Sequence, residues 1–240
     1  MSPTPAILIS GWAHPAGVLC PLAEALGAEF DCICLSTCEL GDDPTLWSVA
    51  LAGRIRAAAA PPLVVGWSLG GMVSLEALTS DAPPPAAALV LVASTPRFCA
   101  APDWAWGQTP SALRALRTGL RRDPRAALAG FLRECAAPAT PGEEALQAGV
   151  DAALSIGLPR LAAGLDHLGS TDLTGRIGRL ETRCLCIHGD ADRIIPCEAS
   201  RAIAKQTAGV LEVLAESGHS VPVASPDRVA DAIRRGWGQR

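Results

Sequence analysis

Six short apolar runs recur along the chain, and a stretch of helical composition follows most of them. Most of these runs are apolar throughout, which is typical of parallel strands that are covered on both faces. Strand and helix units that alternate in this way form a doubly wound sheet. The sequence therefore predicts an α/β fold with a mostly parallel, doubly wound sheet of about six strands. The predicted strands are Ala6–Ser10, Phe30–Leu35, Leu63–Gly66, Ala88–Ala93, Arg183–His188 and Val210–Leu214. The predicted helices are Val18–Leu26, Thr45–Ala59, Gly71–Leu78, Ser200–Thr207 and Arg228–Trp237.

One segment, from about Arg97 to Gly169, breaks the alternation. It shows helical periodicity interrupted by prolines and contains no convincing strand. We therefore expect a helical insertion after the fourth strand, lying over the sheet edge where catalytic loops gather. The predicted organisation is an α/β core of residues 1–96 and 170–240 with a helical lid of residues 97–169. A chain of 240 residues suffices for one sizeable core of this kind.

The composition argues against several functional classes. The net charge of −4 and the isoelectric point near 5.6 disfavour a general nucleic-acid partner. The first residues carry no basic region, and no apolar run is long enough to span a membrane, so we expect a cytoplasmic protein. The nine cysteines show neither paired Cys-x-x-Cys spacing nor histidine partners, and we interpret them as free thiols. We expect no metal, no cofactor and a monomeric chain.

A Gly-x-Ser-x-Gly motif carries the strongest functional signal. Ser68 stands between Gly66 and Gly70, directly after a predicted strand and directly before a predicted helix. A sharp strand-to-helix turn exposes a serine hydroxyl above the sheet, and the flanking glycines keep side chains out of its crowded surroundings. The helix N-terminus adds backbone donors near a developing oxyanion. The context predicts that Ser68 is a catalytic nucleophile.

A serine hydroxyl needs a base within hydrogen-bond reach, and His219 is the predicted base. It lies in a polar loop between the last strand and the last helix, after the serine in chain order. His188 ends a strand, and we expect it beneath the site rather than in it. His14 falls in the first loop as a candidate for lining the pocket, and His167 belongs to the insertion.

The acid of such a triad lies between serine and histidine in the sequence, and the loop after residues 183–188 offers two candidates. Asp192 is followed by an apolar pair and a proline, a pattern that favours a loop turning inward. Asp190 is the alternative, with a more local role as a turn or cap residue. We favour Asp192, whose carboxylate would fix the imidazole tautomer without taking the proton.

The oxyanion hole requires two backbone N–H donors. Leu69, directly after the nucleophile, supplies the first, and Trp12, in the loop after the first strand, is the candidate for the second. The Trp12 indole is equally a candidate for lining the pocket.

These residues give the chain a resemblance to the α/β-hydrolase superfamily over nearly its full length. It most resembles the pimeloyl-[acyl-carrier protein] methyl ester carboxylesterases of biotin synthesis, the BioH type. The matching stretches are Gly11-Trp12, residues 65–71, Gly189 to Pro196, residues 170–173 and Ser217-Gly218-His219 with Pro222. The resemblance implies hydrolysis of the methyl ester of a pimeloyl chain carried on acyl-carrier protein, with the tryptophan after the first-loop glycine in the oxyanion region. Ser10 departs from the histidine usual before Gly-Trp in that family.

The predicted lid is basic, in an otherwise acidic protein. Residues 111–133 contain six arginines and one acidic residue, so this segment has a net charge of +5 and the rest of the chain has a net charge of −9. Arg114, Arg117 and Arg121 share one helical face beside a leucine stripe. This strip suits an acidic carrier protein and the phosphate of its phosphopantetheine arm, although a merely solvated helix face is the alternative. Phe98, Trp104, Trp106, Phe131 and Leu132 are candidates for an acyl channel or for plain core.

Two other functions fit the same motifs. One is a carboxylesterase or thioesterase of this fold that acts on small free substrates. The other is a non-catalytic ligand receptor that retains the triad, because a fold alone does not determine a function.

Overall fold

The computed structural model describes residues 2–238, and its centre is one parallel sheet. The sheet has six strands in the order β2-β1-β3-β4-β5-β6, with every pair parallel, so the predicted fold class is confirmed. The strands are β1 (Thr4–Ile9), β2 (Phe30–Leu35), β3 (Leu63–Trp67), β4 (Ala88–Val92), β5 (Cys184–Gly189) and β6 (Val210–Leu214). Two of the predicted ranges are matched at both ends, and the other four differ by one or two residues at one or both ends.

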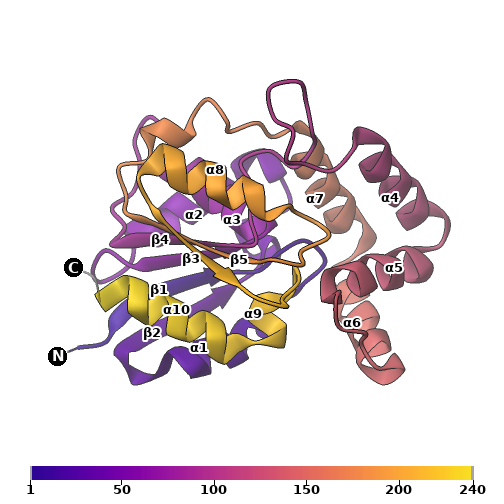
Figure 1. Ribbon diagram of the computed structural model, residues 1–240, viewed down its shortest axis with the longest axis horizontal. Helices are drawn as coiled ribbons and strands as arrows, with labels where there is room; N and C mark the ends of the chain where they lie inside the picture. The colour runs from indigo at the N-terminus through magenta and orange to yellow at the C-terminus, as the bar shows by residue number, and fades with distance from the viewer. Residues whose placement is uncertain (1, 239–240) are drawn as a thin grey trace.

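Helices cover both faces of the sheet (Figure 1). The helices α1 (Cys20–Leu26), α9 (Val221–Ala224) and α10 (Pro226–Gly238) pack on one face, and α2 (Trp47–Arg56), α3 (Leu69–Leu78) and α8 (Cys197–Thr207) pack on the other. Alternate strand residues serve the two layers: Ile7 lies with α2 and α3, and Leu8 with α1 and α10. Short 3₁₀ turns occupy Ala16–Leu19, Gly27–Glu29, Thr37–Leu40, Pro44–Leu46 and Ile177–Arg179.

The predicted helix Thr45–Ala59 is shorter in the structure. Asp43 accepts a hydrogen bond from the Thr45 backbone N–H at 2.9 Å and starts a 3₁₀ turn, so the α-helix begins only at Trp47. It ends at Arg56, ahead of the alanines that the sequence pattern had assigned to it.

The segment between β4 and β5 is helical, as expected. It contains α4 (Pro110–Arg122), α5 (Pro124–Ala136), α6 (Glu143–Ser155) and α7 (Leu158–Ser170), which gather at one end of the sheet (Figure 1). Pro124 and Pro159 do not interrupt helices; they occupy first turns, where a missing N–H costs no hydrogen bond. The division into core and lid at residues 97 and 169 stays a prediction.

The register of β1 and β3 positions the site. Ile9 pairs with Gly66, so the loops that follow these two neighbouring strands leave the same edge of the sheet side by side. Gly189 of β5 pairs with Leu214 of β6. The loops that carry Asp192 and His219 therefore also leave this edge of the sheet side by side. No helix within residues 2–238 is long and apolar enough to cross a membrane.

Candidate active site

Ser68 occupies a strained turn between β3 and α3. Its backbone has φ 53° and ψ −117°, a conformation that side-chain-bearing residues rarely adopt. The turn is tight because its neighbours are glycines. A Cβ on Gly66 would lie 2.5 Å from the Gly71 Cα, and one on Gly70 would lie 2.4 Å from the Ile9 carbonyl oxygen. The backbone around Ser68 therefore forms a sharp strand-to-helix turn flanked by glycines.

A chain of two hydrogen bonds joins the three predicted triad residues. His219 Nδ1 lies 2.9 Å from Asp192 Oδ2, and His219 Nε2 lies 2.9 Å from Ser68 Oγ. A carboxylate only accepts, so Nδ1–H donates to Asp192 and the Ser68 hydroxyl donates to Nε2. Ser68 is 6% exposed and His219 is 1% exposed. This is the arrangement in which an imidazole can remove the serine proton.

Close backbone contacts hold the His219 loop against its surroundings. A Cβ on Gly218 would lie 1.7 Å from the Ala137 carbonyl oxygen at the end of α5, so only glycine fits there. The Ser220 N–H donates to the Cys135 carbonyl oxygen at 3.0 Å, and the Trp67 indole N–H donates to the His219 carbonyl oxygen at 2.9 Å. Residues of β3 and α5 thus fix the backbone of the base.

The structure brings Asp192, and not Asp190, to His219. Asp192 Oδ1 accepts from the backbone N–H groups of Ile194 and Ile195 at 2.8 and 2.9 Å, which turns the loop inward. Burial acts to raise the pKa of Asp192, but the neighbouring His219 and His188 outweigh it and hold that pKa well below its ordinary value. Asp190 instead accepts a long, 3.4 Å hydrogen bond from the Ser217 N–H, a local loop contact.

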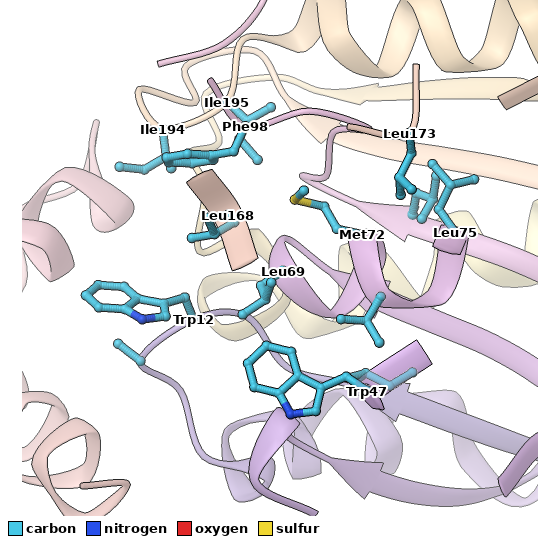
Figure 2. Close-up of a cluster of buried hydrophobic side chains, with 14 of the residues drawn as sticks. Trp12, Trp47, Leu69, Met72, Leu75, Phe98, Leu168, Leu173, Ile194 and Ile195 are labelled. Atoms are coloured by element: carbon cyan, nitrogen blue, oxygen red, sulfur yellow. The ribbon is translucent and has the colours of Figure 1, made fainter. Parts of the chain in front are cut away.

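The two predicted oxyanion residues flank Ser68. Leu69 is the first residue of α3, and a Cβ on Gly11, directly before Trp12, would lie 3.1 Å from the Ser68 Cβ. The Trp12 indole N–H donates to the Leu161 carbonyl oxygen of α7 at 2.8 Å, and its ring meets Phe131 edge-on with centroids 4.7 Å apart. Figure 2 shows Trp12, Leu69 and Leu168 as neighbours in the buried cluster.

His14 has a role that the sequence did not indicate. Its Nδ1–H donates to the Trp12 carbonyl oxygen at 2.8 Å, and the Ser10 hydroxyl donates to the His14 carbonyl oxygen at 2.6 Å. Ala13 between them has a φ of 63°. Burial lowers the pKa of His14 to about 4, against the raising effect of the Trp12 carbonyl, so the ring is neutral at neutral pH. Ser10 and His14 together hold the loop that carries Trp12, the predicted second oxyanion donor.

A cavity of about 190 Å³ lies between α4, α5 and the Asp192 loop. Phe131 lines it and also contacts the Trp12 ring. Gln108 also lines it and donates through Nε2 to the carbonyl oxygens of Arg193 and Ile194 at 3.1 and 2.8 Å. Gln108 was not predicted, because no local sequence pattern marks it. The other lining residues are Phe98, Ala112, Leu113, Leu116, Glu134, Arg193 and Ile194.

The three predicted carrier-binding arginines are all exposed on α4, with buried Leu113 and Leu120 on its inner side. Arg117 forms a salt bridge of 2.6 Å with Asp166 of α7. Its charge is therefore partly compensated within the protein, which the count along the sequence did not reveal. Arg114 and Arg121 form no salt bridge within the described part of the chain.

A serine, a histidine and an aspartate linked at the carboxyl edge of a parallel sheet, with the serine on a glycine-flanked elbow, define the α/β-hydrolase class. Residues 6–232 match the family model described as "Alpha/beta hydrolase family", and the chain belongs to this family.

Relatives with at least 30% sequence identity point to one kind of esterase within this family. A "Pimeloyl-[acyl-carrier protein] methyl ester esterase" of Stenotrophomonas maltophilia is 31% identical over 236 residues, covering 95% of this chain and 90% of that protein. A protein of the same name from Xanthomonas campestris is 30% identical over 237 residues, covering 95% and 93%. The predicted resemblance, and with it the predicted class of ester hydrolase, is confirmed.

Solved structures agree on the fold. A bromoperoxidase from Bacillus anthracis superposes with a TM-score of 0.89 at 16% identity, covering 99% of this chain and 92% of that one. An esterase from Exiguobacterium antarcticum superposes with a TM-score of 0.87 at 20% identity, covering 98% and 91%. At these identities the likeness concerns the fold alone.

Proposed function

We propose that the protein hydrolyses a carboxylic ester through an acyl-enzyme on Ser68, and that the ester is the methyl ester of a pimeloyl chain on acyl-carrier protein. The observation that carries the first part is the pair of 2.9 Å contacts that link Ser68, His219 and Asp192. The names of the relatives, with 90–93% of their length covered, support the second part.

The proposed reaction has two halves. Ser68 Oγ attacks the ester carbonyl while its proton passes to His219 Nε2, and the backbone N–H groups of Trp12 and Leu69 stabilise the resulting oxyanion. Collapse breaks the bond to the methoxy oxygen, which takes the proton from His219 and leaves as methanol. Water, activated by His219, then hydrolyses the acyl-enzyme and restores Ser68. Asp192 stays ionised and stabilises the imidazolium in both halves.

The carrier would meet the exposed face of α4. Arg114 and Arg121, with the partly compensated Arg117, present positive charge to an acidic partner and to the phosphate of its arm. We place the acyl chain beside Phe131 in the cavity that this residue lines, under the α4–α7 segment acting as a lid. In this proposal the enzyme is a cytoplasmic monomer without a metal or cofactor.

Turnover of the pimeloyl-carrier methyl ester, measured beside p-nitrophenyl butyrate, tests the assignment. The double variant Arg114→Gln/Arg121→Gln should lose about tenfold or more in kcat/KM for the carrier substrate and keep its rate on the small ester. The matched control Arg54→Gln/Arg56→Gln removes two exposed arginines from α2 and should leave both rates unchanged. Equal losses on both substrates, or no turnover of the carrier ester by the wild type, would instead favour a small-substrate esterase.

A further inference from the structure

The carboxylate of Asp192 is held by more than the triad. Its Oδ1 accepts two backbone N–H bonds, and its Oδ2, which faces His219, lies 3.1 Å from Nε2 of a second histidine, His188. His188 is the penultimate residue of β5 and is fully buried, as is the Asp192 side chain. Two imidazole rings, from β5 and from the loop after β6, therefore converge on one carboxylate oxygen.

The contacts of His188 determine which of its nitrogens carries the proton. Nε2 lies 2.8 Å from the Ile195 carbonyl oxygen as well as 3.1 Å from Asp192 Oδ2, and both of these groups only accept. Nε2 therefore carries a hydrogen that the two acceptors share. Nδ1 lies 2.7 Å from the hydroxyl of Ser200 on α8, which can donate to it. Ser200 thus keeps the hydrogen of His188 on Nε2, between the Ile195 carbonyl oxygen and Asp192 Oδ2.

Two cysteine thiols on the packed helices act electrostatically with this cluster. Cys135 of α5 and Cys197 of α8 are its titratable neighbours on the packed helices, and burial raises the pKa of both thiols, which keeps them neutral. Asp190 on the same loop also acts on Cys197. Neither thiol therefore places a charge beside Asp192 around neutral pH.

We propose that His188 and Ser200 form a positioning pair for the triad acid. His188 Nε2–H fixes Oδ2 in line with His219 Nδ1 and draws off part of the carboxylate charge, so that Asp192 neither rotates away nor accepts the proton when His219 becomes an imidazolium. Ser200 keeps the His188 hydrogen on Nε2. The inference deepens the proposed function, on which it rests, by adding two residues that act through Asp192 without touching substrate.

A pair of amide substitutions separates positioning from packing. The terminal nitrogen of glutamine in His188→Gln reaches the place of Nε2 and can still donate to Asp192. The nitrogen of asparagine in His188→Asn reaches only the place of Nδ1, near Ser200. His188→Leu removes both contacts, and Ser200→Ala leaves the His188 tautomer unsupported. Thr79→Val, which deletes one buried hydroxyl bonded to the Leu75 carbonyl oxygen, is the control for loss of a buried hydrogen bond elsewhere.

The measurement is the pH profile of kcat/KM for hydrolysis of p-nitrophenyl butyrate, with kcat and KM determined separately. Thermal unfolding of every variant shows whether it is folded. We expect His188→Asn and His188→Leu to lose about 10- to 100-fold in kcat with little change in KM. We also expect their acid limb at a higher pH, because a carboxylate with one donor fewer holds the proton on His219 more strongly. His188→Gln should recover most of the wild-type kcat and most of the wild-type position of the acid limb. Ser200→Ala should give values between those of the wild type and those of His188→Asn. Thr79→Val should keep the wild-type profile.

Two results would overturn the positioning role: wild-type acid limbs in His188→Asn and His188→Leu, or a His188→Gln enzyme no better than His188→Asn. If His188→Leu does not fold, the glutamine and asparagine variants decide. Absence of any Ser68-dependent turnover in the wild type would refute the proposed function instead, so the two failures are distinct.

Discussion

A single methyl group on α7 should disturb the site, because Gly164 lies against Trp12. A Cβ at this position would stand 2.5 Å from Trp12 Cδ1 and 3.0 Å from Nε1, whereas ordinary carbon contacts are about 3.5–4 Å. Gly164→Ala therefore requires a displacement of about 1 Å between α7 and the indole. The indole cannot simply swing aside, since its N–H is bonded to Leu161 and its ring meets Phe131.

The expected effect on activity exceeds the effect on stability. Overpacking costs about 1–3 kcal/mol, and the better helix propensity of alanine returns somewhat less than 1 kcal/mol. At about 2–4 °C per kcal/mol, the Tm should fall by only a few degrees. Because we propose that the Trp12 loop supplies an oxyanion donor, a shift of about 1 Å in this loop is expected to reduce kcat about 100-fold.

Steady-state hydrolysis of p-nitrophenyl butyrate and a thermal melt measure the two effects. The control is Gly130→Ala in α5, where an added Cβ meets nothing within 4 Å, and it should keep full activity with an equal or slightly higher Tm. A Gly164→Ala enzyme within about twofold of the wild-type kcat would refute the argument that Trp12 positions the oxyanion loop.

Three further predictions follow from the described contacts. Gly66→Ala should abolish the native fold, seen as loss of a cooperative melt, because its Cβ would lie 2.5–2.7 Å from backbone atoms of Gly70 and Gly71; a wild-type melt would contradict this. Gln108→Leu removes two hydrogen bonds to the Asp192 loop and should cost about 1–3 kcal/mol in urea unfolding, and an unchanged midpoint would refute it. Burial lowers the pKa of His14 from 6.5 to about 4, so the stability that its neutral form contributes is complete above pH 6.5 and is lost as the pH falls towards 4. His14→Asn, which retains a donor for the Trp12 carbonyl oxygen, should flatten that part of the urea-midpoint profile, and an unaltered slope would count against it.

The sequence predicted those features that depend on local pattern. The inner strands can be recognised in the sequence because residues such as Val64 and Val65 of β3 are buried on the two faces of the sheet, where polar side chains do not fit. The elbow around Ser68 is readable because its geometry demands glycine at fixed positions. Chain order and loop context then suffice to select His219.

Contacts between distant residues could not be predicted in this way. Only their distance from His219 distinguishes Asp192 from Asp190. The fold determines that distance, because His219 follows Asp192 by 27 residues in the sequence. The bond from Gln108 to the Asp192 loop spans 86 residues, and the approach of Gly164 to Trp12 joins α7 to the loop after β1. The salt bridge between Arg117 and Asp166 likewise requires α4 and α7 to be packed together. The spacing of residues along a single sequence does not indicate which distant residues come into contact.

The most direct test of the central claim is active-site labelling. Folded protein is treated with a fluorophosphonate, and the modified residue is located by peptide mass spectrometry. We predict one adduct, on Ser68, with labelling reduced at least 100-fold in His219→Ala, because the hydroxyl reacts only when an imidazole takes its proton. A wild-type protein that melts cooperatively yet carries no adduct on Ser68 would contradict the account and favour a ligand receptor on this fold.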